Sequence, residues 1–180
     1  MKTPQPAIRR KTLAIGAAFC AFAGALAITS GYGPGLDPDS MAYVGAATSF
    51  AHGEGLRVPI GKWERSDSSV ALTVWPPAFP VTMAIPQRLG VAPLTSARIV
   101  IALSAAATAA LVILVLAEAV TAMSAAIGIL IILATPSFVT VHLSVLSEPL
   151  FLVGMMLTLY GMVSRRPAAA AAGAVAAVMT

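Results

Sequence analysis

Three carboxylates are the side chains of this sequence best suited to chemistry. The 180-residue chain has only seven acidic residues, and two of them, Asp37 and Asp39, lie two positions apart in a polar segment that follows a first apolar run. Glu148 stands far downstream, directly after a serine. A carboxylate held near a hydroxyl group can take its proton as the oxygen attacks, which is general base catalysis. These three acids are the candidate catalytic residues.

Each acid also has a structural interpretation. Asp39 precedes an expected helix over residues 40–51 in an N-cap-like position, and Asp is among the best N-cap residues. Asp37 comes before a proline in a turn-rich stretch, which favours a turn residue. Glu148 stands between a serine and a proline, a pattern typical of a helix start in which the serine caps. A capping carboxylate can keep one oxygen free, so both interpretations stay open.

Basic and aromatic side chains between the acids could bind a substrate. If the site handles a lipid phosphate, one or two of Arg57, Lys62 and Arg65 would pair with it, and Arg has the better geometry. Otherwise these cations belong to a solvated loop. Trp75 either anchors the chain at a membrane interface or stacks on a sugar. The single cysteine, Cys20, excludes a disulfide within the chain and a cysteine-based metal site.

The composition indicates that lipid surrounds the elements that carry these residues. Hydrophobic residues make up 58% of the chain and charged residues only 10%, whereas soluble domains carry about 25% charged residues. The net charge of +4 does not indicate a nucleic-acid partner. Four of the eleven basic residues instead precede the first apolar run, at positions 2, 9, 10 and 11, where they hold a cytoplasmic end.

Apolar runs predict an all-α polytopic membrane protein. A signal peptide is the alternative for the first run, but this run is longer than the usual apolar core of about 7–15 residues. The last run stops short of a membrane thickness, so we expect the N-terminal part of a longer protein. The predicted segments are a cytoplasmic N-terminus (1–11), spans at 12–30, 99–118, 123–140 and 149–164, a second outer loop (141–148) and the start of a fifth span (167–180).

Residues 31–98 are predicted to form one large extracytoplasmic loop with short interfacial helices at about 40–51 and 77–89. The second helix is too short to cross a membrane and contains Pro80 and Pro86 after its first residue. With four spans, the N-terminal basic cluster and Arg165-Arg166 share the cytoplasmic side, as the positive-inside rule requires. The three candidate acids then face the same outer surface.

Three short elements occur in order on this predicted outer side. They are Asp39-Ser40-Met41-Ala42-Tyr43, Trp75-Pro76-Pro77-Ala78-Phe79-Pro80 and Leu146-Ser147-Glu148-Pro149-Leu150-Phe151. Their order, spacing and side resemble the N-terminal module of the GT-C membrane glycosyltransferases. The resemblance is greatest to the clan of protein mannosyltransferases and aminoarabinose transferases in glycosyltransferase family 39.

The resemblance implies a fold, an activity and a location. It implies a GT-C-like transmembrane module that transfers a sugar from a polyprenyl-phosphate donor to a hydroxyl group of a lipid, glycan or protein acceptor, with inversion. Asp39 would be the general base, Asp37 a less firmly assigned neighbour, and Glu148 an acid lining the same cavity. Tyr43 would belong to the substrate-binding residues. We expect an integral protein of a bacterial plasma membrane with its active site outside.

One departure from the family bears on cofactors. The common Asp-Glu pair of the first loop is Asp39-Ser40 in this chain, so a two-carboxylate metal site is not expected and no metal or other cofactor is predicted to be required. This 180-residue stretch should be inactive without the rest of the protein. The alternative function is a non-catalytic polytopic protein, a transporter segment or envelope assembly factor, whose outer loop binds a partner.

Overall fold

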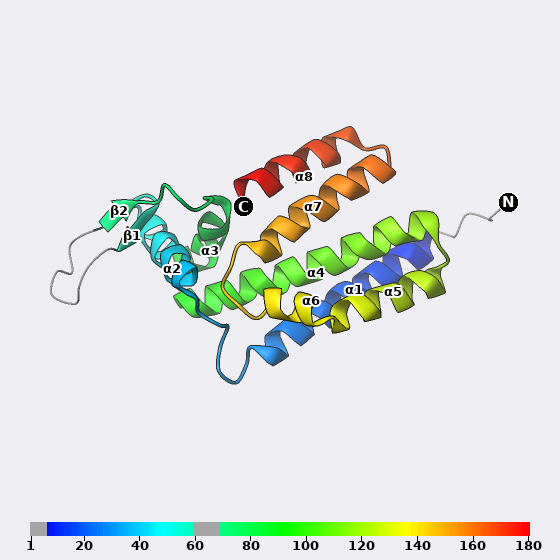
Figure 1. The fold of residues 1–180 in the computed structure, drawn as a ribbon, viewed down its shortest axis with the longest axis horizontal. Coiled ribbons are helices and arrows are strands. Elements are labelled where there is room, and N and C mark those ends of the chain that lie inside the picture. Colours follow the sequence, from blue (N-terminus) through cyan, green and yellow to red (C-terminus); the bar gives the residue numbers. More distant parts are fainter. Residues whose placement is uncertain (1–6, 60–68) are drawn as a thin grey trace.

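The computed structural model describes residues 7–59 and 69–180, and this part of the chain is mostly helical (Figure 1). It forms eight α-helices and one two-stranded antiparallel sheet. The elements are α1 (Ala7–Ile28), α2 (Pro38–Ala51), β1 (Arg57–Pro59), β2 (Ser69–Ala71), α3 (Ala78–Arg88), α4 (Pro93–Ala119), α5 (Ala122–Ala134), α6 (Pro136–Val141), α7 (Glu148–Val163) and α8 (Pro167–Met179).

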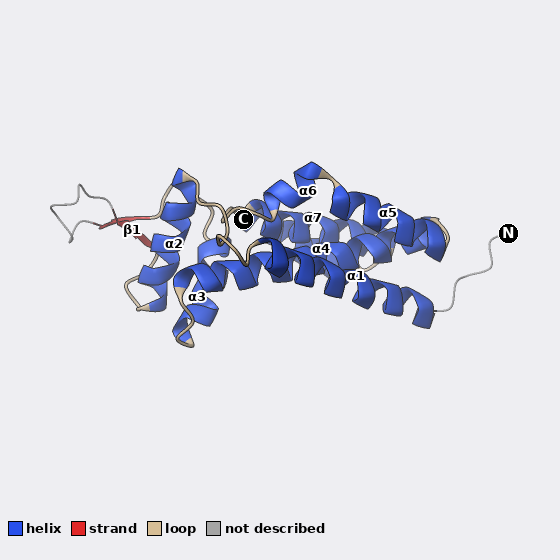
Figure 2. Ribbon diagram, turned by 90° about the horizontal axis from the view of Figure 1, so that it is seen from below, coloured by secondary structure: helices blue, strands red, loops and turns tan. Residues whose placement is uncertain are grey.

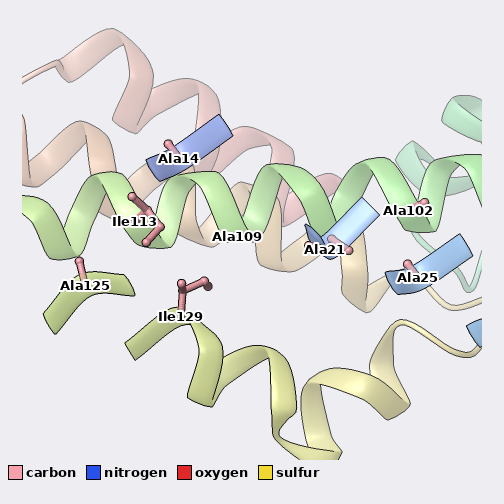
Figure 3. Packing of buried hydrophobic residues seen from close by; sticks show 9 residues of the cluster. Ala14, Ala21, Ala25, Ala102, Ala109, Ile113, Ala125 and Ile129 are labelled. Carbon is pink, nitrogen blue, oxygen red and sulfur yellow. The ribbon is translucent and has the colours of Figure 1, made fainter. Parts of the chain in front are cut away.

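The long helix α4 is the centre of the bundle and packs against α1, α5, α7 and α3. Figure 3 shows its junction with α1 and α5, which is lined mainly by alanine. Ala14, Ala21 and Ala25 of α1 meet Ala102 and Ala109 of α4 in one buried cluster. Small side chains let two helix backbones approach closely, the usual device for packing helices in lipid.

Glycines bring α7 and α8 even closer together. A Cβ atom at Gly154 would lie 2.6 Å from the backbone N of Ala177, and one at Gly161 would lie 2.2 Å from the backbone N of Ala170. A Cβ atom at Gly173 of α8 would likewise meet the α7 backbone. The α7–α8 junction therefore excludes every side chain at these positions.

The bundle has two chemically different ends (Figures 1 and 2). The start of α1 and the turns after α4 and α7 lie at one end, which therefore holds the basic residues of α1 and of the α7–α8 turn. Arg10 of α1 forms an ion pair with Glu118 of α4 there, with 2.7 Å between the charged atoms. The elements α2, α3, β1 and β2 gather at the other end.

Two of the described helices are long and apolar enough to cross a membrane, Arg9–Ile28 within α1 and Pro93–Ala119, which is α4. Only 17% of the most apolar stretch of α1 is buried. Large apolar side chains on its surface, such as Ile15 and Phe19, are each 70% exposed. Exposed apolar surface on this scale is typical of contact with lipid or with another protein.

Several predicted boundaries need correction. The helix expected at 40–51 begins two residues earlier, at Pro38, and the large loop contains the β1–β2 hairpin, which was not predicted. The helix expected at 99–118 begins already at Pro93. The helix expected over 123–140 is interrupted at Thr135, whose extended backbone is favoured before proline.

Candidate functional site

The candidate site is built where the first loop meets the start of α7. The backbone N–H of Gly35 donates to the carbonyl oxygen of Leu143 at 2.7 Å, and the N–H of Val145 donates to the oxygen of Gly35 at 3.0 Å. A Cβ atom at position 35 would lie 3.0 Å from the hydroxyl oxygen of Ser144, so glycine suits this close approach. This backbone bridge ties the segment before α2 to the segment before α7.

Helix α2 begins directly after the bridge, and its first turn corrects the prediction for the two aspartates. Asp37, not Asp39, occupies the N-cap position, and its backbone N–H donates to the Ser40 hydroxyl at 2.9 Å. Pro38 takes the first helical position, which suits proline because it needs no N–H there. Asp39 lies one residue further on, exposed within the first turn, where the helix dipole favours a carboxylate.

Tyr43 connects α2 to α7. Its hydroxyl donates to the Ser147 hydroxyl oxygen at 3.2 Å, across 104 residues of sequence. The ring is only 4% exposed and meets the Phe79 ring edge to face, with 5.3 Å between the ring centroids. Asp39 lies four residues before Tyr43, so the two side chains share one face of α2. Glu148 follows Ser147 as the first residue of α7 and is exposed.

The electrostatics of Tyr43 show that both acids act on this hydroxyl. Burial raises the pKa of Tyr43 above its usual 10.0, and the hydrogen bond to Ser147 partly offsets this rise. The charges of Glu148 and Asp39 then raise the pKa further. A pairwise charge effect falls with distance, so two carboxylates from distant parts of the chain lie close enough to this phenol to act on it. We call Asp39, Tyr43, Ser147 and Glu148 the outer carboxylate site.

Ser147 has a different role from the predicted one. It occupies the N-cap position of α7, but its backbone is helical (φ −79°, ψ −17°) and its side chain makes no capping hydrogen bond. A capping side chain normally needs an extended backbone at this position. The hydroxyl is therefore available to Tyr43. The four-residue spacing of Asp39 and Tyr43 could have indicated that they share one face of a helix, but no sequence signal indicated Ser147 as the partner of Tyr43.

The other predicted binding residues lie away from the outer carboxylate site or outside the described residues. Trp75 is half-buried and packs against the apolar cluster beneath Tyr43, which includes Phe79 and Val145. The guanidinium of Arg57 donates to the hydroxyl and carbonyl oxygens of Ser69 at 2.8 and 2.7 Å, across the β1–β2 hairpin. Lys62 and Arg65 lie outside the described residues, so their predicted role stays a prediction.

Arg98 is a basic residue near this end whose contacts are internal. It donates from Nε to the Thr29 hydroxyl and from Nη2 to the carbonyl oxygen of Leu26, both at 3.2 Å. These atoms belong to the last turn of α1 and the residue after it, where a cation meets the negative end of the helix dipole. Arg98 therefore ties α1 to α4.

The described ranges contain no group of three or more His, Cys, Asp or Glu side chains that could hold a metal ion. Within the same ranges, the carboxylate of Asp39 has no hydrogen-bonding side-chain partner. Comparison with protein-family models, with curated proteins and with solved structures gives no match to this chain. What the outer carboxylate site can do is therefore argued from its own side chains.

Proposed function

We propose that the protein is a membrane glycosyltransferase of the GT-C type, of which these residues form the N-terminal part. It would transfer a sugar from a polyprenyl-phosphate donor to a hydroxyl group of an acceptor, with inversion at the anomeric carbon. The observation that carries the proposal is that the charges of Asp39 and Glu148 both act on the Tyr43 hydroxyl, which binds Ser147 at the end of the bundle opposite the basic residues of α1 and of the α7–α8 turn.

The proposed reaction uses Asp39 as the general base. Its exposed carboxylate takes the proton of the acceptor hydroxyl while that oxygen bonds to the anomeric carbon of the sugar. The bond from the same carbon to the phosphate oxygen breaks, and polyprenyl phosphate leaves with both bonding electrons. Glu148, the first residue of α7, follows the Ser147 that binds the Tyr43 hydroxyl and would orient the acceptor or the sugar by accepting hydrogen bonds.

The proposed placement puts the outer carboxylate site outside a bacterial plasma membrane. The spans would be α1, α4, α5 with α6, and α7. Helices α1 and α4 are long and apolar enough to cross a membrane, and the shorter apolar helices α5 and α7 pack against α4. The basic residues of α1 and of the α7–α8 turn lie at the opposite end, which suits the cytoplasmic side. A cysteine placed at the exposed Thr73 should react with an impermeant reagent from outside, whereas one at the exposed Ala168 in the first turn of α8 should not, both in a Cys20→Ala background.

The central test is Asp39→Asn in the full-length protein, assayed for sugar transfer from a polyprenyl-phosphate donor. Removing a general base typically costs about 10²–10⁴-fold in rate, so we expect a loss of that size. Glu54→Gln is the matched control, because Glu54 is an exposed acid beyond the other end of α2. Near-normal transfer by Asp39→Asn at normal expression would remove Asp39 from catalysis and favour a partner-binding protein instead.

Asp37→Asn separates the two aspartates. Asparagine caps a helix about as well as aspartate, so this change keeps the start of α2 while it removes the charge. If Asp37 serves only as the N-cap, transfer should stay within about twofold of the wild type. A loss as large as that of Asp39→Asn would restore Asp37 to the catalytic residues predicted from the sequence.

A further inference from the structure

A second site lies apart from the outer carboxylate site and shares none of its residues. It is a pocket of about 90 Å³ between α1 and α6, with Ala105 of α4 also in its wall. On the α1 side, Ala21 and Gly24 keep the pocket open, and a Cβ atom at Gly24 would meet nothing within 4 Å. Phe138 and His142 line the opposite wall.

His142 gives this apolar pocket one polar group. The residue is only 4% exposed, and its ring stacks on Phe138 with 4.1 Å between the ring centroids. Its Nδ1 lies 2.8 Å from the carbonyl oxygen of Phe138. A carbonyl oxygen only accepts hydrogen bonds, so Nδ1 carries the proton. Burial lowers the pKa of His142, which keeps the ring neutral at pH 7.

The remaining ring nitrogen is therefore a bare acceptor. Nε2 of His142 is buried and has no hydrogen-bond partner among the described residues. A buried acceptor without a partner is unfavourable, and in native proteins such an atom calls for an explanation. A single acceptor suits a ligand that brings one donor, whereas a buried water usually needs two to four polar partners.

The pocket and its acceptor together identify a chemical class of ligand. We propose that this pocket binds the hydroxyl end of an uncharged lipid alcohol, with the hydroxyl donating to Nε2 of His142. The volume accommodates the hydroxyl and the first few carbons. The remaining hydrocarbon would continue along the apolar surface of α1 at Ile28, which lines the pocket and is 54% exposed. The proposal depends on the proposed membrane placement of α1 and is independent of sugar transfer.

The experiment labels the pocket in the full-length protein reconstituted in lipid vesicles. The probe is hexadecan-1-ol with a photoreactive diazirine near the hydroxyl, compared with its methyl ether, which cannot donate a hydrogen bond. Labelled peptides are mapped by mass spectrometry. We expect the alcohol to label the segments around residues 20–28 and 138–143 roughly two- to tenfold more than the ether, the effect of one hydrogen bond.

Three variants test whether the labelling takes place in the pocket. His142→Phe keeps an aromatic ring against Phe138 but removes the acceptor, and should abolish the preference for the alcohol over the ether. Gly24→Leu fills the pocket and should lower labelling by both probes. Gly16→Leu is the matched control on the same helix, since a Cβ atom there also meets nothing within 4 Å and Gly16 does not line the pocket.

Equal labelling of the wild type by alcohol and ether would overturn the proposal, and this comparison needs no variant to fold. A loss of labelling in Gly16→Leu as large as in Gly24→Leu would also overturn the proposal, because it would indicate ordinary contact of α1 with lipid. Sugar transfer is not the readout, so an inactive protein with selective labelling would refute the proposed function and leave this pocket assignment standing. The cysteine-labelling test of topology shows whether a negative result arises from a wrong membrane placement or from a pocket that does not bind the alcohol.

Discussion

The α7–α8 junction and the α2–α7 junction hold helices together in opposite ways. Between α7 and α8, contact depends on missing side chains, because Gly154, Gly161 and Gly173 bring the backbones together. Between α2 and the start of α7, two specific side chains, those of Tyr43 and Ser147, form a directional hydrogen bond. Backbone packing fixes how close two helices lie, whereas a directional hydrogen bond fixes which residues face each other.

The difference explains why chemistry is expected at only one of these places. Around its three glycines the α7–α8 junction is formed by alanine and threonine, so no side chain there can exchange a proton at neutral pH. The α2–α7 junction holds two exposed carboxylates beside a buried phenol whose proton is held tightly. Close packing at the α7–α8 junction makes α7 rigid. The hydrogen bond at the α2–α7 junction then fixes the position of Asp39 on α2 relative to Glu148 on α7.

The largest effect should come from adding a single methyl group at the α7–α8 junction. At Gly161 a Cβ atom would lie 2.2 Å from the backbone N of Ala170, so Gly161→Ala must push the helices apart. Overpacking of this kind typically costs about 1–3 kcal/mol. We expect a lower free energy of unfolding, measured by denaturation in mixed micelles.

The matched control for that change is Gly16→Ala, which should have the opposite sign. A Cβ atom at Gly16 meets nothing within 4 Å, and alanine is favoured over glycine in a helix by about 0.5–1 kcal/mol. The same substitution therefore destabilises one helix and stabilises another. Equal effects at the two positions would mean that close packing of α7 on α8 is not what distinguishes them.

A smaller effect, mainly on activity, is expected at the α2–α7 junction. Tyr43→Phe keeps the ring against Phe79 and removes only the hydroxyl, and Ser147→Ala removes the acceptor. Each should lower the rate constant of transfer by roughly tenfold, because the carboxylates lose their register. Unfolding should change by at most about 1.5 kcal/mol, the net value of one hydrogen bond.

The double variant Tyr43→Phe/Ser147→Ala tests whether the two residues act through the same hydrogen bond. The double variant should be no slower than either single variant, because both remove the same hydrogen bond. Tyr160→Phe is the control, since Tyr160 lies near the other end of α7 and its ring faces the Arg166 guanidinium 5.7 Å away. Fully additive losses would show that Tyr43 and Ser147 act separately, and the α2–α7 junction would then not depend on one directional hydrogen bond.

Much of this architecture follows from local sequence signals. Apolar runs and proline positions indicated the main helices, because helix periodicity and the missing N–H of proline act within a few residues. The same local reasoning expected the candidate acids to share one end. It misplaced the cap of α2 because Asp37 and Asp39 are both acceptable caps, and only the path of the chain through Gly35 decides between them.

The Tyr43–Ser147 hydrogen bond could not be predicted from local sequence patterns. It joins residues 104 positions apart, and no spacing rule relates them. A serine before a helix indicates a cap, so the sequence favoured the local partner over the distant one. The unpartnered Nε2 of His142 is a similar case, since its environment comes from α1 and α6 together. Sites assembled across helices need the tertiary structure to be seen.

The smallest effect, and the most specific to the outer carboxylate site, concerns alkaline pH. The folded protein raises the pKa of Tyr43 above 10.0, chiefly by burial against Phe79 and then through the charges of Glu148 and Asp39. A group that holds its proton more tightly when folded stabilises the fold below its unfolded pKa, and that contribution is lost as the pH rises through the folded value. Stability should therefore fall as the pH rises above about 10.

Tyr43→Phe isolates this contribution from the other groups that titrate in the same range. Phenylalanine cannot ionise, so the variant should lose less stability than the wild type between neutral pH and strongly alkaline pH. The expected difference is at most a few degrees in the midpoint of thermal unfolding. Parallel curves for the wild type and Tyr43→Phe would mean that the pKa of Tyr43 is not raised in the folded protein, which would remove the electrostatic support for the outer carboxylate site.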